Sequence, residues 1–176
     1  TAYVEAEAKG SWSTTKEPGF AFHNGNYRDG ENPFVAGTVR QSKTSRSKKR
    51  YNIISYQPNF PESGKYAVYV SYQTVKRSID DATYTVWHKG EKTTFKVNQQ
   101  MGGSTWVYLG TFDFDKGSSE FNRVELTSQS RHRRGVVTAD AVRFGGGMGN
   151  IERGGTTSHM PRCLEGARYY AQWAGM

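Results

Sequence analysis

Apolar and polar residues alternate with a period of two along the middle of this chain. The clearest run is 65–73 (KYAVYVSYQ), and the runs at 82–89, 92–98 and 105–114 repeat the pattern, with glycine-containing turns between them. Successive side chains of a β-strand point to opposite faces, so this alternation predicts strands that are buried on one side. Turn signals about every ten residues favour antiparallel sheets over a fold in which strands and helices alternate.

Four further segments, 1–8, 49–57, 121–128 and 135–144, also have the composition of strands. No convincing helical pattern occurs before residue 158. A total of about eight or nine strands indicates an all-β domain with an antiparallel, jelly-roll-like β-sandwich.

A glycine-rich stretch at 145–149 (GGGMG) ends the strand pattern and is typical of a flexible hinge. It lacks the following helix and the lysine of a phosphate-binding loop. Beyond it, Pro161 and apolar residues at helical spacing predict a short C-terminal helix, which must pack on something to be stable. We therefore expect a sandwich at 1–147, and at 148–176 a linker and helix that lead toward a neighbouring domain outside this sequence.

The chain has 176 residues, which suits one domain, and a formal net charge of +8. Six lysines and arginines fall within 40–50 without an acid, and three arginines fall within 131–134. Such runs occur in solvated loops and in surfaces for nucleic acid, anionic lipid or acidic polysaccharide. We find no helix-turn-helix, zinc-finger or RNP-like motif, so no nucleic-acid partner is expected. No apolar run is long enough for a transmembrane segment, and one cysteine excludes an internal disulfide.

The sequence contains no recognisable catalytic motif. The four histidines lack metal-ligand spacing, and no GxSxG motif is present. Asp113 and Asp115 share one face of a strand, which could suit acid–base chemistry or a cation, but a solvent-facing position is the simpler interpretation. Asp140 lies among small and apolar residues, so we expect it to hold a loop through hydrogen bonds. No catalytic residue, metal or cofactor is predicted, although a lyase-type site of Tyr, His and Arg would converge only in space.

Several segments, in order, resemble one known family. YAVYVSY, DDATYTVWHKG, VNQ, GGSTWVYLGTFDF and VVTADAVRFGGG are similar to the golvesin/xanthan lyase C-terminal-like domain over about residues 1–147, most strongly at 62–147. The resemblance implies an accessory β-sandwich of large secreted or cell-envelope bacterial proteins that act on polysaccharides or resemble amidases, with a role in binding or presenting glycan. It supplies no agreed set of binding residues, and the basic segment at 40–50 is longer than in simpler members.

We therefore predict a non-catalytic module that belongs to a larger exported lyase or hydrolase and binds polysaccharide or peptidoglycan. Aromatic rings would stack on the sugar, while amide and guanidinium groups would bind its hydroxyls. The candidate residues are Trp12, Tyr27, Trp87, Trp106, Gln99 and Arg131. One alternative is a structural spacer that packs against the parent catalytic domain and leaves an apolar patch bare in this chain. The other is an enzyme in its own right.

Overall fold

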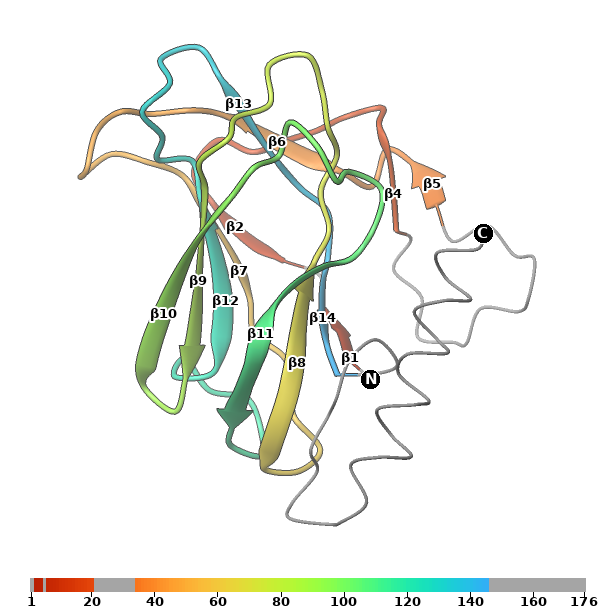
Figure 1. Cartoon of the computed structure of the whole chain (residues 1–176), viewed down its shortest axis with the longest axis vertical. Helices are drawn as coiled ribbons and strands as arrows, with labels where there is room; N and C mark the ends of the chain where they lie inside the picture. The colour runs from red at the N-terminus through yellow and green to blue at the C-terminus, as the bar shows by residue number, and fades with distance from the viewer. Residues whose placement is uncertain (1, 5, 21–33, 146–176) are drawn as a thin grey trace.

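A computed structural model describes residues 2–4, 6–20 and 34–145 of the chain (Figure 1). All regular secondary structure in these residues is β-strand, which confirms the predicted all-β class. No helix among them is long and apolar enough to cross a membrane. The expected hinge and C-terminal helix lie outside the described residues, and so does Tyr27.

The larger sheet has five strands in the order β10-β9-β12-β7-β2, and each neighbouring pair is antiparallel. Its strands are β2 (Glu7–Lys9), β7 (Ile53–Tyr56), β9 (Ala82–His88), β10 (Glu91–Val97) and β12 (Arg123–Thr127). The three long members β9, β10 and β12 correspond to the predicted strands at 82–89, 92–98 and 121–128.

A second sheet has four antiparallel strands in the order β1-β14-β8-β11. They are β1 (Ala2–Val4), β8 (Gly64–Val70), β11 (Val107–Phe114) and β14 (Val142–Phe144). The pairing of β8 with β11 shifts register at a bulge near Gly110, where the chain bends.

Two small sheets extend one end of the sandwich. One has the order β13-β6-β3 and the other pairs β4 with β5. Their strands are β3 (Ser13–Thr14), β4 (Pro18–Phe20), β5 (Phe34–Ala36), β6 (Arg40–Lys43) and β13 (Val136–Ala139). The strands β3, β4, β5 and β6 were not predicted, because each has only two to four residues and most lie in Gly-, Ser- or Arg-rich sequence without clear alternation.

The main hydrophobic core lies between the two large sheets. From β8 it receives Val68 and Val70, and from the facing sheet it receives Tyr84, Val86 and others. The opposite side of β8 is also covered, since Tyr69 belongs to a second, smaller cluster. The predicted assignment of alternate β8 side chains to opposite faces is therefore confirmed, with both faces buried.

The predicted single strand at 135–144 is wrong, because the chain forms β13 and β14 in two different sheets. Val137 and Ala139 face the main core, and so do Val142 and Phe144. The core-facing residues have odd numbers in β13 and even numbers in β14, because the inward–outward alternation of side chains shifts by one residue at Asp140. This step carries the chain from the small sheet into the four-stranded sheet.

The two ends of the sandwich differ in how the strands are joined (Figure 1). At one end, Lys89 and Gly90 form the two-residue β9–β10 turn with φ angles of 50° and 81°. Positive φ at both positions matches the turn type that suits the twist of a hairpin. At the other end, segments 43–50, 74–81 and 128–135 lead toward β7, β9 and β13. We call these three segments the loop end.

Candidate functional site

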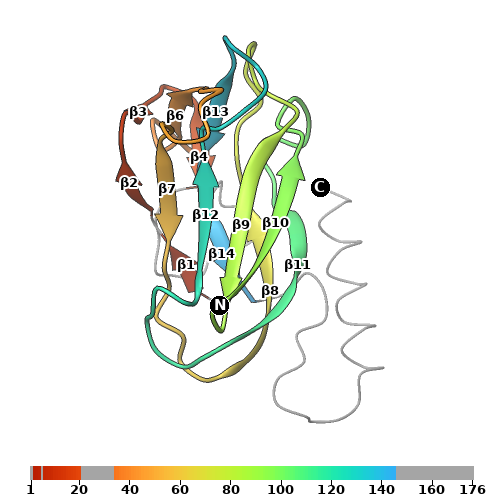
Figure 2. The same ribbon diagram turned by 90° about the vertical axis from the view of Figure 1, so that its left-hand side faces the viewer.

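The outer face of the five-stranded sheet is turned toward the viewer in Figure 2, and no other described strand lies over it. Strand register arranges the outward side chains of β10, β9 and β12 in three cross-strand rows. The rows are Lys92–Trp87–Arg123, Thr94–Thr85–Glu125 and Lys96–Thr83–Thr127. We call these nine residues the outer rows. They combine one indole ring with cations, hydroxyls and a carboxylate, so the surface they form is polar.

Trp87 is half-buried between its two cationic neighbours. The guanidinium carbon of Arg123 lies 4.6 Å from the ring centroid, and the Nζ of Lys92 lies 5.7 Å away. Both distances are within the range of cation–π contact, which holds the ring in place. Arg123 also donates a 2.8 Å hydrogen bond to Glu125, so one cation connects the first row to the second.

Two polar atoms of the outer rows are buried and have no hydrogen-bond partner within the described part of the chain. They are Nε1 of Trp87 and Oγ1 of Thr127. Buried polar groups are nearly always bonded, because an unmade hydrogen bond costs about 1–3 kcal/mol. Neighbouring hydroxyls of the rows are satisfied, since Lys96 donates to Thr83 at 2.8 Å. A third such atom, the hydroxyl oxygen of Tyr69, lies away from this face in the smaller core cluster.

Gln99 and Trp106 do not present a surface to a sugar. The Gln99 side chain is 0% exposed, and its amide makes paired hydrogen bonds of 2.9 and 3.0 Å with the backbone of Thr138. Trp106 is 6% exposed and stacks on Phe20 with ring centroids 4.6 Å apart. For both residues, the expected solvent-facing binding role is corrected to a structural one. The polar sequence around Gln99 gave no sign of burial, whereas Trp106 belongs to the predicted strand at 105–114, where a position in the core was the open alternative.

Of the other candidates, Trp12 is half-buried and Arg131 is exposed. The Trp12 indole packs against the main core and donates a 3.1 Å hydrogen bond to the carbonyl of Ile53. Arg131 belongs to the loop end, whereas Trp87 lies near the hairpin end of β9. At a strand rise of about 3.3 Å per residue, the two are separated by roughly 20 Å. The structure therefore does not gather the predicted residues into one site.

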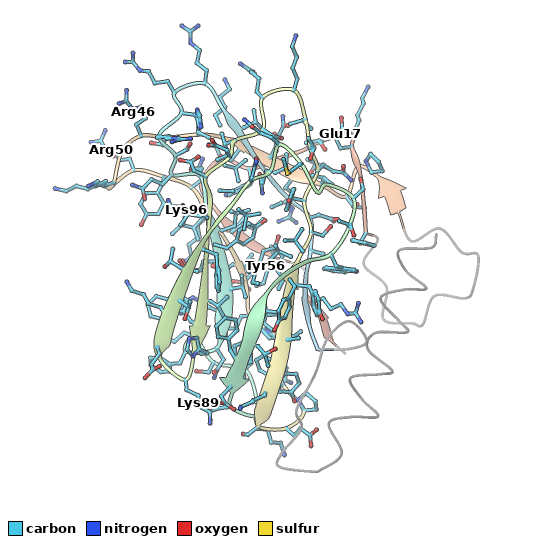
Figure 3. All side chains as sticks on the ribbon, in the orientation of Figure 1. Glu17, Arg46, Arg50, Tyr56, Lys89 and Lys96 are labelled. Atoms are coloured by element: carbon cyan, nitrogen blue, oxygen red, sulfur yellow. The ribbon has the colours of Figure 1, made fainter. Side chains whose placement is uncertain are left out.

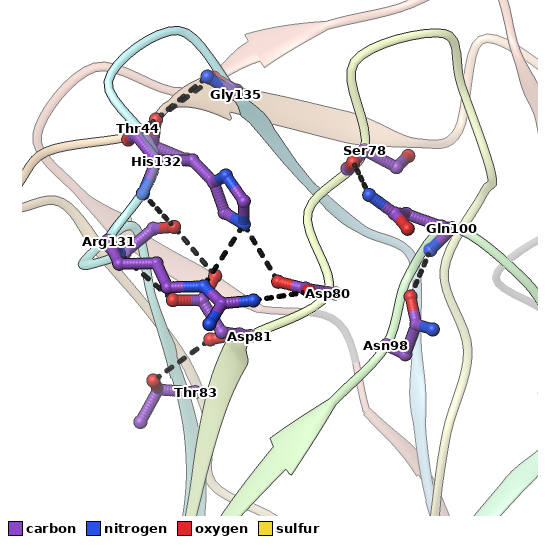
Figure 4. Close-up of polar contacts among 11 residues, drawn as sticks. Thr44, Ser78, Asp80, Asp81, Thr83, Asn98, Gln100, Arg131, His132 and Gly135 are labelled. Atoms are coloured by element: carbon purple, nitrogen blue, oxygen red, sulfur yellow. Dashed lines mark hydrogen bonds and ion pairs between the residues drawn. The ribbon is translucent and has the colours of Figure 1, made fainter.

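A cluster of Asp80, Asp81 and His132 joins two segments of the loop end (Figure 4). Asp80 is bonded by Nε2 of His132 at 2.7 Å and by Nη2 of Arg131 at 2.5 Å. Asp81 accepts hydrogen bonds from the Ser130 hydroxyl and the Arg131 amide. These acids lie about fifty positions from their partners along the chain, so the sequence could not pair them.

The cluster has ligand atoms within 4.8 Å of one another, a spacing that a cation would accept. However, both carboxylates already accept hydrogen bonds from protein donors. The hydrogen bond from His132, together with the charge of Arg131, holds the pKa of Asp80 below its usual range. We therefore interpret the cluster as a clamp between segments 74–81 and 128–135.

The remaining ionisable groups behave as parts of the scaffold. Burial raises the pKa of Tyr69, Tyr72 and Tyr84, which is opposite to the shift that a tyrosine base requires. Asp140 accepts hydrogen bonds from the Phe20 amide at 2.9 Å and the Ser71 hydroxyl at 3.1 Å, which confirms its predicted role in holding a loop. Asp113 and Asp115 are both exposed, as the simpler interpretation held.

Two packed antiparallel sheets, with an open polar face, define this chain as a β-sandwich module. It belongs to the Golvesin C-terminal domain family, whose family model matches residues 1–146. The resemblance found in the sequence is thereby confirmed.

Comparison with individual proteins gives two informative matches. A xanthan lyase of Bacillus sp. (strain GL1) is 31% identical over 91 residues, which cover 52% of this chain and 10% of that protein. The solved structure of Paenibacillus xanthan lyase matches with a TM-score of 0.58 and 25% identity, over 79% of this chain and 12% of that chain. The chain thus spans about a tenth of the length of these relatives.

Proposed function

We propose that this domain is a non-catalytic, carbohydrate-binding accessory module of a larger exported bacterial enzyme that acts on polysaccharide or the cell wall. Membership in the Golvesin C-terminal domain family supports this assignment, as does the likeness to a small part of proteins named xanthan lyase. A segment that makes up 10% of a relative is of a size that suits an appendage to a separate catalytic domain.

The observation that carries the proposal is the open sheet face of the outer rows, where the half-buried indole of Trp87 lies beside hydroxyls and cations. Five strands spaced about 4.8 Å apart make a face roughly 20 Å wide, which suits an extended polymer. Sugar hydroxyls would bond to the hydroxyl and cationic groups of the rows, while an apolar sugar face would lie against the indole.

The chemistry of the described residues supports binding rather than catalysis. The carboxylates of the clamp are engaged by protein donors, and Asp140 is bonded inside the scaffold. A general acid or base needs a free approach to its substrate and a pKa near the working pH. The tyrosines Tyr69, Tyr72 and Tyr84 have their pKa values moved away from that range.

The first prediction concerns Trp87. We expect W87A to weaken glycan binding about tenfold, because it removes both the ring and the Nε1 donor. W87F keeps a ring and removes only the donor, so we expect a smaller loss of roughly three- to fivefold. Affinity electrophoresis against a panel that includes xanthan, dextran and peptidoglycan fragments measures both effects.

The matched control is Y108A, which removes an exposed aromatic side chain from β11 in the other sheet. Thermal unfolding of each variant separates loss of binding from loss of fold. If no glycan is retained by the wild-type chain, or if W87A and Y108A bind alike, the face of the outer rows is not the binding surface.

The spacer alternative is favoured by a different surface. Tyr108 on β11 is 54% exposed, and its ring centroid lies 5.4 Å from that of Tyr69. The four-stranded sheet therefore presents an exposed aromatic side chain. A neighbouring domain could pack there. In the parent protein, Y108S would then loosen the domain contact and lower the unfolding temperature of the whole chain, whereas W87A would not.

A further inference from the structure

The three segments of the loop end are fastened to one another by backbone hydrogen bonds. The Ser45 amide donates to the Ser128 carbonyl, and the Ser130 amide donates back to the Ser45 carbonyl, both at 2.9 Å. The Val136 amide, at the start of β13, donates to the Arg77 carbonyl at 2.8 Å. Together with the clamp, these bonds bring three separate parts of the sequence into one surface (Figure 1).

This surface concentrates the charge of the chain. Segments 43–50, 74–81 and 128–135 contain ten of the 24 lysines and arginines but only two of the 16 acids. The remaining 14 basic and 14 acidic residues cancel, so the loop end accounts for the entire net charge of +8. The two basic runs seen in the sequence are therefore parts of one cationic surface.

Most of these cations have no acidic partner. Arg131 pairs with Asp80 at 2.5 Å, whereas the other nine make no ion pair within the described part of the chain. The nine are exposed: Lys43, Arg46, Lys48, Lys49, Arg50, Lys76, Arg77, Arg133 and Arg134. Figure 3 shows Arg46 and Arg50 extending outward from this end of the molecule. Like charges repel one another, so their concentration costs stability unless an anionic partner is bound.

The backbone that carries the cations is already ordered. The Ser45 hydroxyl donates to the Arg50 carbonyl at 2.6 Å, and the Ser47 hydroxyl accepts from the amides of Lys49 and Arg50. These bonds hold the basic segment in one conformation before any ligand arrives. A preformed surface loses less conformational entropy on binding than a flexible basic tail would.

The composition of the loop end distinguishes between classes of anionic polymer. The three segments contain no Phe, Tyr or Trp, and the exposed Tyr51 that follows Arg50 is one ring, whereas single-stranded nucleic acids are held largely by stacking on successive aromatic rings. They offer no helix to enter a major groove. Within the three segments, Ile79 is buried and Val75 is half-buried, so the segments themselves offer no exposed apolar side chain for insertion into a bilayer. Arginine forks suit the planar carboxylate of an acidic sugar, and the serine and threonine hydroxyls suit its neutral groups.

We propose that the loop end is a binding site for anionic polysaccharide, separate from the sheet face around Trp87. The proposal rests on the proposed function only in taking the partner to be a polysaccharide. It adds the charge class of that partner and a second point of contact, about 20 Å from the first along β9. A long chain of acidic sugars would reach both.

The test measures binding of the 176-residue chain to polygalacturonate, dextran sulfate and neutral dextran at 50 and 300 mM NaCl. We expect tight binding to the acidic polymers at low salt and at least about tenfold weaker binding at high salt, because exposed charges are screened. The variants K48Q/K49Q and R133Q/R134Q each remove two charges from a different segment. Each should weaken polygalacturonate binding about fivefold.

The matched control is K89Q/K116Q, which removes two exposed charges outside the loop end and should bind polygalacturonate like the wild type. Equal binding by the loop variants and this control would overturn the proposal.

Tighter binding to duplex DNA or to phosphatidylglycerol vesicles than to polygalacturonate would also overturn it. W87A and the loop variants separate this proposal from the proposed function: W87A should weaken dextran binding and leave the loop end intact, whereas K48Q/K49Q should weaken polygalacturonate binding and leave the sheet face intact. Comparison of polygalacturonate with dextran sulfate identifies the preferred anion.

Discussion

Two residues that were predicted to bind a ligand contribute to the stability of the fold instead. Gln99 and Trp106 were both predicted to contact a ligand, yet both side chains are buried. Gln99 replaces a missing strand neighbour, since its amide pairs with the Thr138 backbone as another strand would. At the scale of single residues, the sequence shows which side chains have the chemistry for binding. It does not show whether the side chain of a loop residue points inward or outward.

We expect Q99A to lower the free energy of unfolding by about 2–4 kcal/mol, because it leaves the amide and carbonyl of Thr138 unpaired in the interior. Urea denaturation measures the change. The adjacent and exposed Gln100 provides the control, and Q100A should cost less than about 1 kcal/mol. A Q99A variant with wild-type stability and weakened glycan binding would contradict the structural role.

Asp80 leads to a prediction about pH. Its folded pKa is lowered by the hydrogen bond from His132 and the charge of Arg131. A carboxyl with a lowered folded pKa adds stability above its unfolded pKa, near 4, and loses that contribution as the pH falls through the folded value. D80N should therefore be less stable than the wild type at pH 7, and the difference should shrink below about pH 4.

Denaturant unfolding at pH 7 and at pH 3 tests this expectation. The comparison variant is D113N, which removes an exposed carboxylate that makes no ion pair within the described residues. A gap between D80N and the wild type that is the same at both pH values would show that the clamp does not depend on the charge of Asp80.

At the scale of elements, the long strands were predictable and most of the short ones were not, with β7 inside the predicted strand at 49–57 as an exception. The strands β8 to β12 have five to eight residues each, and their side chains alternate between two faces, which leaves a period of two in the sequence. The strand β6 has four residues, and its Arg-Gln-Ser-Lys sequence is typical of a solvated loop. Its place in a sheet comes from pairing with β13, a contact between residues nearly a hundred positions apart.

The break between β13 and β14 could not be predicted for a related reason. The sequence at 135–144 alternates smoothly enough for one strand. The change of sheet at Asp140 is stabilised by bonds to Phe20 and Ser71, which are distant in the chain. Local pattern therefore predicts the presence of strands, whereas their partition between sheets depends on tertiary hydrogen bonds.

At the scale of the whole molecule, the two charge runs of the sequence become one cationic end because β6, β8 and β12 all finish there. The runs were predictable from composition, but their meeting was not, since it depends on the topology of the sandwich. The rest of the chain is neutral overall, so the molecule has a strong charge asymmetry along its strands. Such an asymmetry would orient the domain on the anionic polymer that we propose as its partner.

The asymmetry also predicts how stability responds to salt. Repulsion among nine unpaired cations should destabilise the folded chain at low ionic strength, and salt should relieve it as the screening length falls below about 10 Å. We expect K48Q/K49Q to raise the unfolding temperature by about 1–3 °C in 10 mM NaCl and by less than that in 300 mM NaCl. K89Q/K116Q should give no such rise, because Lys89 lies 3.9 Å from Asp115.

Polygalacturonate should act in the same direction as salt. A polymer that binds only the folded chain raises its unfolding temperature in proportion to its occupancy, and the rise should be largest where screening is weakest. The wild type should therefore gain more from polygalacturonate than K48Q/K49Q does, in 10 mM NaCl. If both gain equally, or if salt alone lowers the unfolding temperature of the wild type, then charge repulsion at the loop end does not limit stability.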